Sequence, residues 1–84
     1  MNYGVEWVPI AQNRLAALWV NASDRAAVAA AADAIDARLA RDPYANSESR
    51  TGSVRVTFEP PLGVQYDVDD ARRRVTVLWV WSFQ

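Results

Sequence analysis

The segment 73–83 constrains the fold of this chain most, because it is apolar on both of its alternating faces. If the segment is extended, successive side chains point to opposite sides. One side then carries Val75, Val77, Trp79, Trp81 and Phe83, and the other carries Thr76, Leu78, Val80 and Ser82. A strand with apolar side chains on both faces is typical of the centre of a sheet. The chain is therefore predicted to build a sheet around this segment.

Two helices joined by a short turn are predicted upstream. Pro9 suits the first turn of a helix over residues 10–20, where its missing N–H is not needed. Ser23 is predicted to cap a second helix over residues 24–41, which ends before Pro43 because proline disfavours the helical conformation of its predecessor. An apolar stripe at helical spacing runs along the second helix and consists of Val28, Ala32, Ile35 and Leu39.

Three further segments, 1–8, 54–59 and 64–69, alternate with the period of a strand. Residues 43–52 are polar and are predicted to form a loop. The order of elements predicts a single α+β domain over residues 1–84, in which the helical hairpin covers one face of a mostly antiparallel four-stranded sheet. The other face stays open, and the doubly apolar last strand is a plausible partner for the first.

Composition excludes several kinds of chemistry. The 84 residues include no cysteine and no histidine, so thiolate and imidazole ligands and the commonest general base are missing, and no metal or cofactor is expected. Nine basic residues face ten acidic ones, which gives a net charge of −1 without the basic surplus typical of nucleic-acid binders. No apolar run predicts a signal peptide or membrane span, so a cytoplasmic protein without a membrane partner is expected.

Exposed apolar residues are the candidates for partner contact. Leu78 and Val80 fall on the sheet face predicted to be open, and an apolar open face usually has a partner. Trp19 on the first helix is a third candidate for partner contact. Trp79 and Trp81 share a face with the strand's valines and are predicted to pack under the helices, with a partner-binding surface as the alternative.

Charged and titratable residues receive mainly structural interpretations. Arg55 lies on the polar face of its strand, where it either contacts a phosphate or a partner or is a solvated side chain near Glu59. Tyr66 is predicted to pack in the core, with proton transfer as the alternative. The run 72–74 is interpreted as a charged hairpin tip beside aspartates, with a nucleic-acid contact as the alternative. Asp33 and Asp36 are interpreted as a solvated face of the second helix.

Several stretches with this order of elements resemble one known family. They are Tyr3–Pro9, Leu15–Trp19, Ala32–Asp36, Leu39–Pro43, Pro61–Asp69 and Val75–Leu78. Together they resemble the RelE/ParE toxin superfamily of bacterial type II toxin–antitoxin modules. The resemblance implies a cytoplasmic toxin, neutralised by an antitoxin, that acts by ribosome-dependent mRNA cleavage or by inhibiting DNA gyrase. A homodimer is a further expectation.

The RelE-type catalytic residues are mostly replaced in this chain. The family's arginine at the head of the third strand corresponds to Gly63, and its C-terminal acid/base positions fall near Phe83 and Gln84. By resemblance, only Arg55, with Arg50 before it, remains as a candidate for the basic catalytic group of the second strand. Cleavage through the RNA 2′-hydroxyl also needs groups that take and give a proton. A catalytically degenerate protein-binding module is therefore the alternative to an active toxin.

Overall fold

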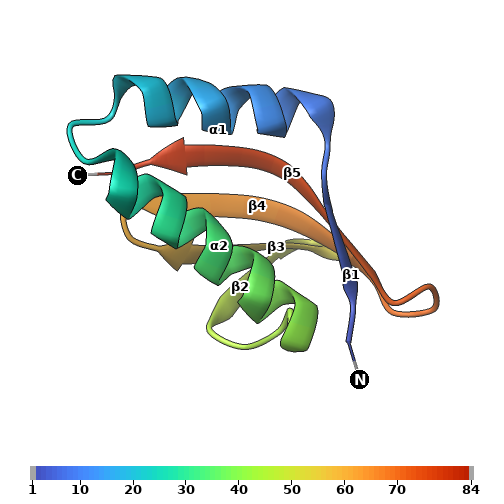
Figure 1. The fold of residues 1–84 in the computed structure, drawn as a ribbon. Helices are drawn as coiled ribbons and strands as arrows, with labels where there is room; N and C mark the ends of the chain where they lie inside the picture. The colour runs from blue at the N-terminus through green and yellow to red at the C-terminus, as the bar shows by residue number, and fades with distance from the viewer. Residues whose placement is uncertain (1, 84) are drawn as a thin grey trace.

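The computed structural model describes residues 2–83 and confirms an α+β fold (Figure 1). Its elements in chain order are β1 (Gly4–Trp7), α1 (Pro9–Asn21), α2 (Arg25–Arg41), β2 (Ser47–Thr51), β3 (Val54–Glu59), β4 (Leu62–Asp69) and β5 (Arg74–Ser82). Gln84, to which the resemblance assigned an acid/base position, lies outside the described residues. Within residues 2–83 no helix is long and apolar enough to cross a membrane.

The sheet has five strands in the order β1-β5-β4-β3-β2, so the predicted number of four is wrong. The missed strand is β2, which lies in the segment predicted to be a loop and pairs with β3 from Ser47 opposite Thr57 onward. Its polar sequence carries no hydrophobic alternation, and the backbone ladder to β3 holds it in place. β1 pairs with β5 in parallel and the other neighbours are antiparallel, so the pairing of the first strand with the last, which the sequence left open, is present.

The helical hairpin forms largely where the sequence predicts it. Pro9 occupies the first turn of α1. The cap of α2 is Asp24 rather than the predicted Ser23, because the Asp24 carboxylate accepts a 3.0 Å hydrogen bond from the Ala27 N–H. At the other end of α2 the N–H of Asp42 donates to the Arg38 carbonyl at 2.8 Å.

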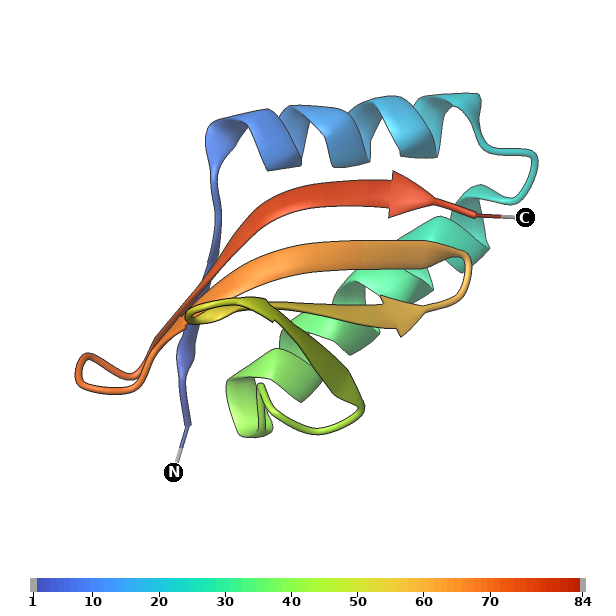
Figure 2. The same cartoon turned by 180° about the vertical axis from the view of Figure 1, so that it is seen from behind.

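One face of the sheet is packed under α2, whereas α1 runs beside β5 (Figure 1). Figure 2 shows the opposite face, which no helix covers and which we call the open face. The core is almost entirely aliphatic apart from one tyrosine. Its fully buried members include Ile35, Leu39, Leu62, Val64, Tyr66, Val75, Val77 and Val80. Tyr66 is therefore a core residue, as predicted, and its hydroxyl donates to the carbonyl of Pro43.

A bulge in β5 changes which side chains face the helices. The register moves from Tyr66 opposite Val77 to Gln65 opposite Trp79, so that Leu78 is an extra residue in β5. Beyond the bulge the alternation is shifted by one position. Val80 is consequently buried at 0% exposure, and Trp79 is 37% exposed. The expectation that Val80 lies on the open face and the tryptophans lie in the core is wrong.

β3 directs its polar side chains toward the helices and its apolar ones away from them. Thr57 is 0% exposed and lies in register with the core residue Val64. The Arg38 guanidinium of α2 reaches across and donates to the Thr57 hydroxyl at 2.9 Å and to the Glu59 carboxylate at 3.2 Å. These bonds give the Thr57 hydroxyl and the Glu59 carboxylate a partner, whereas the buried Nε of Arg38 has no hydrogen-bond partner among residues 2–83. The apolar positions of β3, including Phe58, therefore lie on the open face.

Candidate functional site

The open face carries a cluster of large aromatic side chains from β3 and β5. The Phe58 ring meets the Trp81 ring edge-on at 5.9 Å between centroids and the Phe83 ring at 5.7 Å. Phe58 is 44% exposed and Trp79, on the same face, is 37% exposed. We call Phe58, Trp79, Trp81 and Phe83 the open-face aromatic cluster. Contiguous apolar surface of this kind on a sheet usually marks an interaction site.

Gly63 allows the Trp81 indole to lie against β4. The two residues are directly opposite each other in the β4–β5 ladder. A Cβ atom at position 63 would come within 2.5 Å of the indole ring atoms, which is well inside van der Waals contact. The glycine that replaces the arginine expected of a RelE-type site therefore has a steric role here.

The arginines beside the open face differ in their partners. The Arg14 guanidinium of α1 lies 5.6 Å from the centroid of the Trp79 ring, within the range of a cation–π contact. Of the strand arginines, Arg50 pairs with Glu48 at 3.1 Å and Arg74 pairs with Glu6 at 3.0 Å. Such surface pairs contribute little stability, but each places a carboxylate beside the cation. The face therefore has aromatic character, and Arg50 and Arg74 each have a carboxylate beside them whereas Arg14 lies over a ring.

Arg55 lies on the helix-facing side of β3, in register with Tyr66. It is half-buried, donates through Nε to the Ser47 hydroxyl at 2.9 Å, and lies 5.1 Å from the centroid of the Tyr44 ring. Arg50, by contrast, is exposed and paired with Glu48. The structure thus does not join the two arginines in one site, and their catalytic role remains an untested prediction.

Two tyrosines and an aspartate tie the N-terminus, the α2–β2 loop and the β4–β5 turn together. The hydroxyls of Tyr3 and Tyr44 each donate to the Asp70 carboxylate at 2.6 Å. The two hydroxyls hold the pKa of Asp70 below its usual value. In turn, the hydrogen bond to Asp70 raises the pKa of Tyr44 to about 12, and the same interaction raises that of Tyr3. The phenols are therefore protonated at neutral pH, and we call the three residues the tyrosine clamp.

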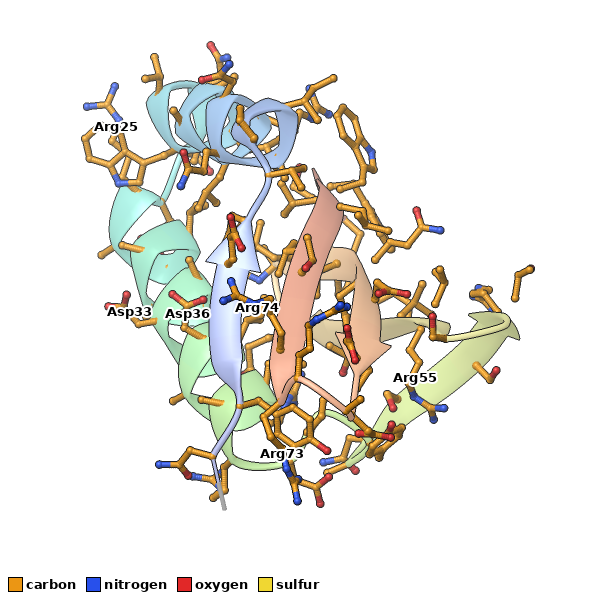
Figure 3. The ribbon with its side chains drawn as sticks, turned by 90° about the vertical axis from the view of Figure 1, so that its right-hand side faces the viewer. Arg25, Asp33, Asp36, Arg55, Arg73 and Arg74 are labelled. Carbon is orange, nitrogen blue, oxygen red and sulfur yellow. The ribbon has the colours of Figure 1, made fainter. Side chains whose placement is uncertain are left out.

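A groove of about 510 Å³ runs between the two helices. Trp19 is 41% exposed and lines it, and the Arg25 guanidinium lies 4.9 Å from the centroid of its ring. Asp33 and Asp36 line the groove from α2 and lie next to each other in Figure 3. This interhelical groove was not predicted, although Trp19 was proposed for partner contact from sequence. Leu78, the other candidate that stays partly exposed, is the bulge residue of β5.

No metal site accompanies these surfaces in the part of the chain that the structure describes. Residues 2–83 contain no group of three or more His, Cys, Asp or Glu side chains placed to hold a metal ion. Their only clustered titratable groups with shifted pKa values are those of the tyrosine clamp. The candidate surfaces for binding are the open-face aromatic cluster and the interhelical groove.

Two solved structures of toxin–antitoxin complexes contain chains with this fold. A chain of the RelBE2 complex from Mycobacterium tuberculosis is 19% identical with a TM-score of 0.81, over 98% of this chain and 92% of that one. A chain of the archaeal RelE–RelB complex from Pyrococcus horikoshii OT3 is 17% identical with a TM-score of 0.72, over 98% and 96%. The sequence matches no protein-family model and no curated protein. The chain thus shares the fold of a chain in each of these two complexes, in agreement with the fold that the resemblance predicted.

Proposed function

We propose that this protein is the toxin-type component of a type II toxin–antitoxin module, that an antitoxin neutralises it, and that it acts by binding a protein. The RelE fold, shared over 98% of the chain with members of two toxin–antitoxin complexes, supports the module. The open-face aromatic cluster supports the mode of action. Its exposed rings provide the large, rigid apolar area that anchors protein interfaces.

Ribosome-dependent mRNA cleavage fits the same surface poorly. The reaction needs a group that takes the 2′-hydroxyl proton, a group that gives a proton to the leaving oxygen, and cations for the pentavalent phosphorus. Of the strand arginines other than Arg55, Arg50 is paired with Glu48 and Arg74 with Glu6. Arg55 faces the helix-covered side of the sheet. A target of the gyrase kind, which is bound as a protein, agrees better with an aromatic surface.

Expression in a bacterial host tests the proposal. We expect the chain alone to arrest growth without mRNA cleavage, and co-expression of the small reading frame next to its gene to restore growth. Phe58→Ser should relieve the arrest, because it removes an exposed ring from the cluster. Ile10→Ser is the matched control, since Ile10 is a 63% exposed apolar residue on α1. Sequencing of mRNA 5′ ends monitors cleavage.

The possible results separate the candidate functions. Cleaved mRNA, together with relief of the growth arrest by Arg55→Ala, would establish mRNA cleavage as the function and overturn protein binding. A chain that is harmless alone but binds the neighbouring product would be the catalytically degenerate binding module. Arrest that persists in Phe58→Ser while the variant remains folded would remove the aromatic cluster from the function.

A further inference from the structure

The two edges of the sheet differ in how far the helices cover them. β1 forms one edge, and α2 lies against it. There the Tyr3 N–H donates to the Ala40 carbonyl at 2.7 Å, and the Trp7 indole donates to the α2 carboxylate of Asp36 at 2.7 Å. β2 forms the other edge and lies on the side of the sheet away from both helices (Figure 3). Because the outward N–H and C=O groups of an edge strand can pair with another strand, the β2 edge is where this sheet can be extended.

The side chains of β2 carry opposite charges two positions apart. Glu48 and Arg50 are exposed, and Ser49 between them is uncharged. The Arg50 guanidinium lies 3.1 Å from the Glu48 carboxylate, so both side chains are on the same side of the strand. An edge strand whose charges share one sign repels an identical strand, because like charges directly opposite each other are destabilising. The two signs on β2 instead make this strand complementary to a copy of itself.

We propose that β2 pairs with β2 of a second copy of this chain, antiparallel and about a two-fold axis at Ser49. In this register Glu48 of each copy lies opposite Arg50 of the other, so the symmetric interface forms the same ion pair twice. The axis is perpendicular to the sheet, and the five strands of each copy join into one continuous sheet. The open-face aromatic clusters of both copies then lie on the same side of that sheet.

The association is expected to be weak, because the pairing covers few residues. β2 is five residues long, and its register with β3 shifts between Ser49 and Thr51. Stable dimers bury about 1,200–2,000 Å² in total, which is more than such a short pair of strands provides. We therefore expect the dimer to form at protein concentrations of about 0.1–1 mM. Sedimentation equilibrium from about 10 μM to 1 mM covers this range.

Charge reversal on β2 supplies the test variants. Glu48→Arg gives the strand two cations and Arg50→Glu gives it two anions, so each variant should self-associate about tenfold more weakly than the wild type. An equal mixture of the two variants should form a heterodimer, because opposite charges then face each other again. Glu6→Arg is the matched control, since it makes the same change of charge at an exposed position of β1, on the opposite edge of the sheet. Circular dichroism verifies that every variant is folded.

Amide hydrogen exchange locates the contact, because the outward N–H groups of β2 should exchange more slowly as the protein concentration rises. A chain that stays monomeric up to about 1 mM overturns the proposal. A dimer that Phe58→Ser dissociates and Glu48→Arg leaves intact also overturns it, since the open face would then hold the second copy. Charge variants that dissociate but do not pair when mixed would do the same. None of these results bears on the proposed function, whose own test is growth arrest.

Discussion

The two faces of the sheet are both apolar, yet they use different side chains. Apart from the polar side chains of β3, the helix-covered face is built from branched aliphatic residues and Tyr66, which are buried. The open face carries the aromatic cluster, in which Phe58 and Trp79 remain substantially exposed. Aliphatic side chains fill the space under α2, whereas on the open face the Phe58 ring packs against the rings of Trp81 and Phe83. The comparison indicates that one face provides stability and that the other is available for binding.

The largest loss of stability is expected from a truncation on the covered face. Ile35→Ala removes a side chain that is 0% exposed and leaves a cavity beneath α2. The free energy of unfolding should fall by about 2–5 kcal/mol. Urea denaturation measures it. A loss no greater than that of an open-face truncation would contradict the division of roles between the faces.

The next largest effect is expected where the open face touches the backbone of β4. In Gly63→Ala the new Cβ meets the Trp81 indole at 2.5 Å, so that the ring must move. Such overpacking should cost about 1–3 kcal/mol. Adding Trp81→Ala removes the clash, and a double-mutant cycle should therefore show strong coupling between the two positions. Additive effects would argue against contact between the indole and Gly63.

Substitutions of two neighbouring residues of β5 compare how much the two faces contribute to stability. Val80→Ala truncates a buried side chain and should cost about 1–2 kcal/mol, whereas Trp79→Ser, despite the larger side chain, should cost about 1 kcal/mol or less. Growth arrest should respond in the opposite order, because Trp79 belongs to the open-face aromatic cluster. Denaturation measures the stability of each variant, and a growth assay measures the toxicity of each. A greater loss of stability in Trp79→Ser would place its indole in the core.

The smallest effect on stability is expected for the tyrosine clamp, and it depends on pH. The pKa of Tyr44 is raised to about 12 in the folded state, above its ordinary value of 10.0. The unfolded chain therefore loses this proton first, and stability should decline as the pH rises from about 10 to 12. Tyr44→Phe should reduce that decline in denaturation experiments at alkaline pH. At acid pH the lowered pKa of Asp70 works in the opposite sense, since stability is lost as the pH falls through that value.

The sequence predicts where the helices and strands lie better than it predicts which face of the sheet each side chain occupies. Alternation and proline positions locate both helices and four strands, because these signals depend on local chemistry. β2 was missed since a polar edge strand depends on the partner that it pairs with. The orientation of β3 is also hidden, because it depends on Arg38 reaching Thr57 from a helix far away in sequence. Pattern alone places Arg55 on the polar side of its strand, and only the fold shows that this side faces inward.

The open-face site was predicted incompletely for a related reason. A strand that is apolar on both faces gives no sign of where an extra residue enters the ladder. Strict alternation through Leu78 therefore assigned Trp79 and Trp81 to the core and Val80 to the surface. The interhelical groove likewise depends on how far two helices diverge, which the stripe of alanines does not determine. Only the exposure of Trp19 was anticipated.

The bulge at Leu78 also makes the chemical nature of the exposed surface depend on how one residue meets the β4–β5 ladder. If Leu78 paired as an ordinary ladder residue, uninterrupted alternation would turn Trp79 and Trp81 toward the helices and Val80 toward the open face. Deletion of Leu78 would instead remove the bulge and leave Trp79 opposite Gln65, with both tryptophans still on the open face. The register of the ladder after this position, rather than the length of the strand, therefore determines whether the open face is aromatic or aliphatic.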